Sequence, residues 1–126
     1  MLEKEKQNLN KIKTTCAKQK ARWWDIFAEY VIHKTYSFKN NVFYGVRESE
    51  LKGYGIRLNI NGKTGFSFCS DISMIDSVIE HARATASYGE IEEYELPSAQ
   101  PLPCVACYDE NVFKKDTNYY IHTLQS

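Results

Sequence analysis

The chain has 126 residues, a length within the usual range for a single domain. Hydrophobic residues make up 43% of the sequence and charged residues 25%, which excludes a chain that is disordered throughout. The 16 basic residues balance the 16 acidic ones, so the chain lacks the basic excess of most nucleic-acid-binding proteins. No apolar run approaches the ~20 residues of a membrane-spanning helix, and the first residues lack the apolar core of a signal peptide. We expect a cytoplasmic protein that binds neither nucleic acid nor membrane.

The first predicted element is a helix over about residues 3–20. Leu9, Ile12 and Cys16 follow the spacing of one helical stripe. The lysines around this stripe are interpreted as a solvated helix face rather than as a patch for nucleic acid or membrane.

Alternating aromatic and β-branched residues predict a strand that begins at Trp23 and runs to about residue 35. Trp23 and Trp24 are adjacent, so they must lie on opposite faces of that strand. A turn at residues 40–41 leads into a second predicted strand over residues 42–48. The polar stretch 48–53 ends at a glycine, and it is predicted to separate this second strand from the next one.

The strongest local signal is a β-hairpin. Residues 54–60 and 63–69 both have strand patterns, and Asn61-Gly62 lies between them. Both central positions of a type I′ turn require a positive φ, which Asn and Gly tolerate best. Phe66 and Phe68 are predicted to share one face of the second strand.

A helix is predicted over residues 71–88, with Ser70 or Asp71 as its cap and Gly89 as its stop. The prolines within residues 97–103 favour an extended connector. Asp116-Thr117 is a good cap for a last, short helix. The predicted fold class is therefore α+β, a mainly antiparallel sheet of about four strands with helices packed on one face.

Residues that could carry chemistry are few. Cys104 and Cys107 form a Cys-x-x-Cys pair, but redox pairs open a helix and zinc sites need two further ligands at short spacing. The pair is interpreted as two incidental reduced thiols. The three histidines, at positions 33, 81 and 122, are isolated in the sequence. We therefore assign no catalytic, cofactor-binding or metal-binding residue.

The stretch from Asp25 to Ser87 nevertheless resembles the amino-terminal domain of the TldD/PmbA family, called modulators of DNA gyrase in older usage. The resemblance is carried by the order and spacing of Ala28-Glu29, Gly53-Tyr54-Gly55-Ile56-Arg57, Asn61-Gly62-Lys63-Thr64-Gly65-Phe66 and Asp71-Ile72-Ser73. Pro101-Leu102-Pro103 and Tyr108-Asp109 look like the family's linker out of this domain.

The resemblance implies a zinc metallopeptidase system that acts on unfolded peptides, often as a heterodimer. In that family a His-Glu-x-x-x-His helix and a distant Cys bind zinc in the following domain. This sequence contains no His-Glu-x-x-x-His, so no catalytic residue carries over. We expect residues 1–96 to be the family domain, and residues 97–126 to be a connector and the start of a truncated following segment.

These observations support three functional hypotheses. The first is a non-catalytic amino-terminal domain that contributes a substrate-chamber or dimer surface, with zinc in the following domain. Its partners would be the rest of such a chain, a homologous subunit in a homo- or heterodimer, and unfolded peptide. The second is a free-standing binding or adaptor domain. The third is a thiol or zinc protein built on Cys104 and Cys107. Whether the chain is itself an enzyme stays open.

Overall fold

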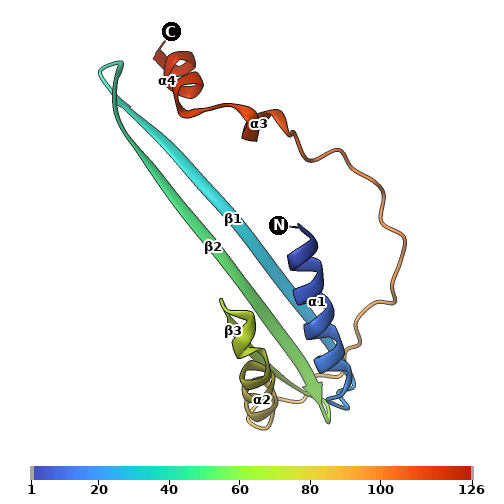
Figure 1. Ribbon diagram of the computed structural model, residues 1–126. Helices are drawn as coiled ribbons and strands as arrows, with labels where there is room; N and C mark the ends of the chain where they lie inside the picture. Colours follow the sequence, from blue (N-terminus) through green and yellow to red (C-terminus); the bar gives the residue numbers. More distant parts are fainter. Residues whose placement is uncertain (1, 126) are drawn as a thin grey trace. The chain divides into compact units, whose positions relative to one another are not determined.

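Three strands form one antiparallel sheet in the order β1-β2-β3 (Figure 1). The computed structural model describes residues 2–125. These residues group into two compact units, one containing the chain up to Val31 together with Leu51–Pro97, the other Ile32–Glu50 together with the chain from Ser98 onward. The elements in chain order are α1 (Leu2–Ala17), β1 (Trp23–Lys39), β2 (Val42–Ile60), β3 (Lys63–Cys69), a 3-10 turn (Ile72–Met74), α2 (Ile75–Ala86), α3 (Asn111–Lys114) and α4 (Thr117–Gln125).

The α+β class is confirmed, but the sheet has three strands rather than four. The predicted break at residues 48–53 is absent, and β2 continues from Val42 to Ile60. Gly53 and Gly55 adopt no positive φ, so both stay in extended backbone. Polar side chains do not end a strand whose backbone still pairs with a neighbouring strand. Over residues 48–53 that neighbour is β1, because β3 pairs only with Tyr54–Ile60.

The predicted hairpin between β2 and β3 is confirmed. Asn61 and Gly62 have φ values of 51° and 81°, both positive as the turn requires. The register pairs Ile60 with Lys63 and Tyr54 with Cys69. The side-chain oxygen of Asn59 accepts a hydrogen bond from the Gly62 amide at 3.2 Å, which adds a second restraint on the turn.

One face of the sheet carries the core of the first unit, and α1 and α2 pack on it. Ile12 and Cys16 of α1 are fully buried, as the helical stripe predicts. They meet the inward residues of β2 and the apolar stripe of α2 in one cluster. Its other members are Tyr54, Ile56, Leu58, Ile75, Val78, Ile79 and Ala82. Burial raises the pKa of the Cys16 thiol to about 11, so this cysteine is a structural, unreactive thiol.

The start of α2 is close to the prediction. Asp71 accepts a hydrogen bond from the Ser73 amide at 2.8 Å, although a 3-10 turn comes first and the α-helix begins at Ile75. Gly65 of β3 is buried directly against this helix. A Cβ atom built at Gly65 would lie 1.8 Å from the Ala82 carbonyl oxygen, so only glycine fits at this crossing.

A polar network ties α1 to β2. Tyr54 is 2% exposed, and its hydroxyl donates a hydrogen bond to Glu5 at 2.5 Å. Asn8 donates to the same hydroxyl at 3.0 Å, and Lys52 forms an ion pair with Glu5 at 2.6 Å. The bonds from Lys52 and Tyr54 lower the pKa of Glu5, while burial raises the pKa of Tyr54. The buried hydroxyl is therefore fully partnered.

The second unit contains the remaining parts of β1 and β2, together with α3 and α4. Tyr36 stacks on Tyr120 of α4 with ring centroids 5.3 Å apart. Asp116 accepts a hydrogen bond from the Tyr119 amide at 2.8 Å, which confirms the predicted cap of the last helix. No helix within residues 2–125 is long and apolar enough to cross a bilayer.

Candidate functional site

The sheet face opposite α1 and α2 has two halves, and the chain covers one of them itself. Residues 89–95, here called the cover segment, lie against the start of β1. The Trp23 and Tyr94 rings pack with centroids 5.2 Å apart, and the Trp23 indole N–H donates to the Tyr94 carbonyl at 3.1 Å. Trp23 is consequently only 8% exposed. The sequence correctly places the two tryptophans on opposite faces, with Trp24 against the core. Trp23 lies on the face away from the core, where Tyr94 covers it.

Polar contacts hold the cover segment at both ends. The Glu92 amide donates to the Gly62 carbonyl at 2.7 Å, and Thr64 donates to the Glu92 carboxylate. Arg22 pairs with Glu95 at 2.9 Å. The cover segment is thus attached to the hairpin and to the residue before β1.

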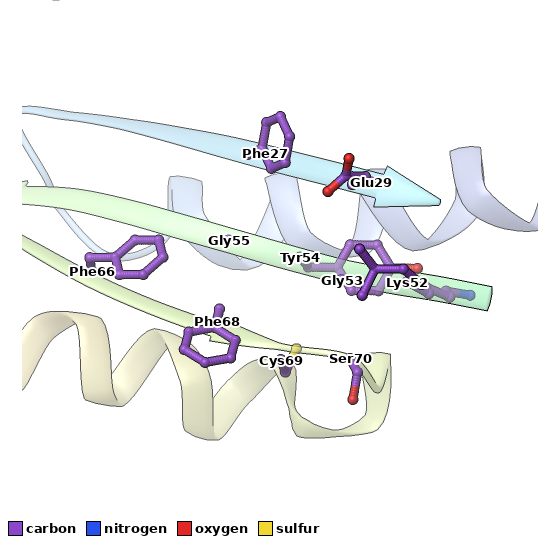
Figure 2. Close-up of a pocket in the computed structure, with 11 residues that line it drawn as sticks. Phe27, Glu29, Lys52, Gly53, Tyr54, Gly55, Phe66, Phe68, Cys69 and Ser70 are labelled. Carbon is purple, nitrogen blue, oxygen red and sulfur yellow. The ribbon is translucent and has the colours of Figure 1, made fainter. Parts of the chain in front are cut away.

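The other half of this face is an open pocket of about 350 Å³, here called the aromatic groove (Figure 2). Phe27 of β1 lies on one side of β2, and Phe66 and Phe68 of β3 lie on the other. These three rings are 68%, 54% and 73% exposed, and Leu51 is 56% exposed. The shared face of Phe66 and Phe68 is as predicted.

Two glycines form the floor of the groove. A Cβ atom at Gly55 would lie 3.2 Å from the Phe66 ring and 3.9 Å from the Phe27 Cβ, so β2 is bare backbone between these rings. A Cβ atom at Gly53 would meet only the Cys69 carbonyl, at an ordinary 3.7 Å. Unlike the floor at Gly55, the floor at Gly53 therefore has room for another group.

The rim of the groove is polar but carries no catalytic arrangement. Glu29, Lys52, Ser70 and Cys69 line it. Burial raises the pKa of the Cys69 thiol, with a smaller contribution from Asp71, so Cys69 is a poor nucleophile. Lys52 is already paired with Glu5. The groove is suited to binding an apolar side chain beside a charge, rather than to breaking a bond.

The Cys-x-x-Cys pair belongs to the second unit, and neither cysteine lines the aromatic groove. Cys104 and Cys107 are exposed free thiols in a stretch without regular secondary structure. Within residues 2–125, the structure places no three His, Cys, Asp or Glu side chains where they could bind a metal ion. Cys16 and Cys69 are not brought into such a cluster with them.

A family model described as PmbA/TldA metallopeptidase domain 1 matches residues 24–86, half of the chain. The chain belongs to the PmbA/TldD family. The matched region begins in β1 and ends with α2, so it contains every residue that forms the aromatic groove in this PmbA/TldD domain. The cover segment lies just beyond the match. No curated protein matches the chain.

The sequence contained a signal for the aromatic groove that the prediction did not use. Gly53 and Gly55 alternate on one face of β2, and Phe66 and Phe68 alternate on one face of β3. The pairing of Gly55 with Phe68 puts both sets on the same side of the sheet. Where aromatic residues on one strand face glycines on the next, the rings stand around a surface that has no side chains of its own. The predicted hairpin register is sufficient to identify such a surface in this sequence.

Proposed function

We propose that this chain acts as the non-catalytic first domain of a PmbA/TldD-type zinc metallopeptidase that acts on unfolded peptides. The domain contributes a wall of the substrate chamber or the contact with a homologous subunit, in a homo- or heterodimer. Residues 1–96 form this domain, and residues 97–126 connect it to the next domain of the peptidase. The observation that carries the proposal is an exposed aromatic groove that lies wholly within the region matched by the family.

The residues of this chain do not fit the zinc site that the family resemblance implies. Such a site needs two histidines one helical turn apart and a glutamate that activates water. His81 lies on α2, but no histidine lies four or five residues from it, where Asp76, Ser77, Thr85 and Ala86 stand. We therefore assign zinc to another domain of the peptidase and derive no catalytic step for this one.

Three exposed phenylalanines around a glycine floor support a role in contacts. Large apolar rings exposed side by side favour burial against another polypeptide, because water disfavours contiguous apolar surface. A peptidase that accepts unfolded chains must bind them without a strict sequence requirement, and an apolar wall meets that need. The same surface would also suit a subunit contact.

Substitutions in the full-length peptidase and its partner subunit test the proposal. Phe27→Glu and Phe68→Glu each place a charge in the aromatic groove at an exposed site, so the fold should survive. We expect loss of peptide cleavage, of subunit assembly, or of both, measured by cleavage of an unfolded peptide and by sedimentation. Tyr44→Glu is the matched control, because Tyr44 is 78% exposed on β2 outside the groove. If both groove variants assemble and cleave like the control, the proposed role is wrong.

A further inference from the structure

We propose that the aromatic groove binds an extended segment of a partner polypeptide in which an aromatic side chain is flanked by Lys or Arg. The inference rests on the proposed function and deepens it, because it states what chemistry the exposed surface recognises. It depends on three features of the first unit: the groove's width, the way the neighbouring half of the face is covered, and the charge left at the rim.

The width of the groove favours a side chain from an extended segment over a packed helix. Phe27 on β1 and Phe66 on β3 stand on strands separated by β2, and adjacent strands lie about 4.8 Å apart. The strand backbones that carry the walls are therefore roughly 10 Å apart, while an α-helix with its side chains is about 10–12 Å across. The rings narrow the gap further, because a Cβ atom at Gly55 would lie within 4 Å of both Phe66 and Phe27. A helix would rest on the rings and leave the glycine floor empty. A single aromatic ring from an extended segment can reach Gly53.

The cover segment shows how this face binds such a chain. On the neighbouring half, an extended stretch places the Tyr94 ring on Trp23, and its carbonyl accepts from the indole N–H at 3.1 Å. Its carboxylates meet Thr64 and Arg22. The interaction combines one aromatic anchor with flanking charges that match polar groups of the sheet. The groove repeats this composition, with an apolar centre and a charged rim, but without an occupant from the same unit.

The charge at the groove's rim sets the expected flanking residue. Lys52 is neutralised by Glu5 at 2.6 Å, and the nearby Asp25 is neutralised by Arg57. The Glu29 side chain lines the groove and, among the described residues, forms no ion pair. The uncompensated charge is therefore negative, so a Lys or Arg next to the aromatic residue complements it.

The backbone of β2 does not take part in this recognition. β2 lies between β1 and β3, and its peptide groups point along the plane of the sheet, so a segment lying over the face gains no strand-to-strand hydrogen bonds from the floor. Binding consequently depends on the ring and the flanking charge. Stacking of one aromatic side chain contributes a modest free energy, so we expect weak binding that changes several-fold when either group is altered.

The test uses the whole chain and a labelled, unstructured Gly/Ser peptide that carries a central Lys-Tyr pair, with binding measured by fluorescence anisotropy. Analogues replace the Tyr with Ala, or the Lys with Glu. We expect affinity to fall about fivefold to tenfold without the ring and about threefold with the reversed charge. Gly53→Val should abolish binding because it fills the floor, where the added Cβ would meet only the Cys69 carbonyl at 3.7 Å. Gly45→Val is the matched control, because it makes the same change in β2 at a site with nothing within 4 Å.

A charge-reversal variant tests the proposed binding without adding a side chain at Gly53. Glu29→Lys changes an exposed side chain, and we expect it to bind the Glu-Tyr analogue more tightly than the Lys-Tyr peptide. Equal binding of all peptides, or equal loss in the Gly45 and Gly53 variants, would overturn the inference. It would also be overturned if Gly53→Val merely converted a dimer of the chain into monomers, since a second copy would then be the occupant. Failure here, with Phe27→Glu still impairing the full-length peptidase, would leave the proposed function standing.

Discussion

At the scale of single residues, Gly65 has the strictest requirement in the fold. The Cβ of an alanine there would lie 1.8 Å from the Ala82 carbonyl oxygen and 2.5 Å from the Ala86 amide nitrogen. Both atoms belong to the α2 backbone, which cannot move aside without shifting the helix. We predict that Gly65→Ala lowers the free energy of unfolding by roughly 1–3 kcal/mol or more, measured by urea denaturation.

Gly53→Ala is the control for this prediction, because its Cβ would meet only the Cys69 carbonyl at 3.7 Å. Both changes have the same effect on the unfolded chain, where glycine is the more flexible residue. An equal stability of the two variants would mean that α2 lies farther from β3 than the structure shows.

At the scale of elements, the attachment of α1 depends on the ionisation of Glu5. Hydrogen bonds from Lys52 and Tyr54 lower the pKa of this carboxyl in the folded protein. A lowered pKa means that the ionised form stabilises the fold above the usual glutamate pKa, and that this contribution is lost as the pH falls through the folded-state value. We predict that Glu5→Gln destabilises the chain by about 1 kcal/mol at neutral pH, and that the difference shrinks as the pH falls below the ordinary glutamate pKa of about 4.3.

Melting midpoints of the two proteins across that pH range provide the measurement. Glu3→Gln is the control, because Glu3 forms only an exposed pair with Lys6 on the same helix. If the melting midpoints of Glu5→Gln and the unmodified chain differ by the same amount from neutral to acid pH, the effect comes from lost packing and not from the lost charge.

Local elements could be predicted from the sequence better than contacts between distant segments. Asn61-Gly62 specifies its turn through the φ values of two adjacent residues, and the stripe of α2 specifies its buried face. The continuity of β2 through residues 48–53 could not be read locally, because it depends on pairing with β1. The burial of Trp23 was also inaccessible, since Tyr94 lies 71 residues away. The aromatic groove required one further step, the register that brings glycines and phenylalanines to one face.

At the scale of the whole molecule, the sequence and the family membership lead to a prediction about activity. The chain lacks the paired histidines and glutamate with which zinc peptidases activate water. We predict that the purified chain cleaves no unfolded peptide, with zinc or with a chelator. The measurement is release of fragments from a denatured, labelled protein. A complete, zinc-containing PmbA/TldD-type peptidase serves as the positive control, and chelator-sensitive cleavage by the chain alone would contradict the prediction.

The position of the two adjacent tryptophans gives the chain a spectroscopic reporter for each face of its sheet. Trp24 is packed against the core, whereas the indole of Trp23 is hydrogen-bonded to Tyr94 and lies 5.8 Å from the Arg57 guanidinium. A Trp24→Phe variant would emit from Trp23 alone, so its emission maximum would shift to longer wavelength when the cover segment leaves the sheet and water reaches the ring. A Trp23→Phe variant would emit from the core. Comparing the two signals during unfolding distinguishes release of the cover segment from loss of the core.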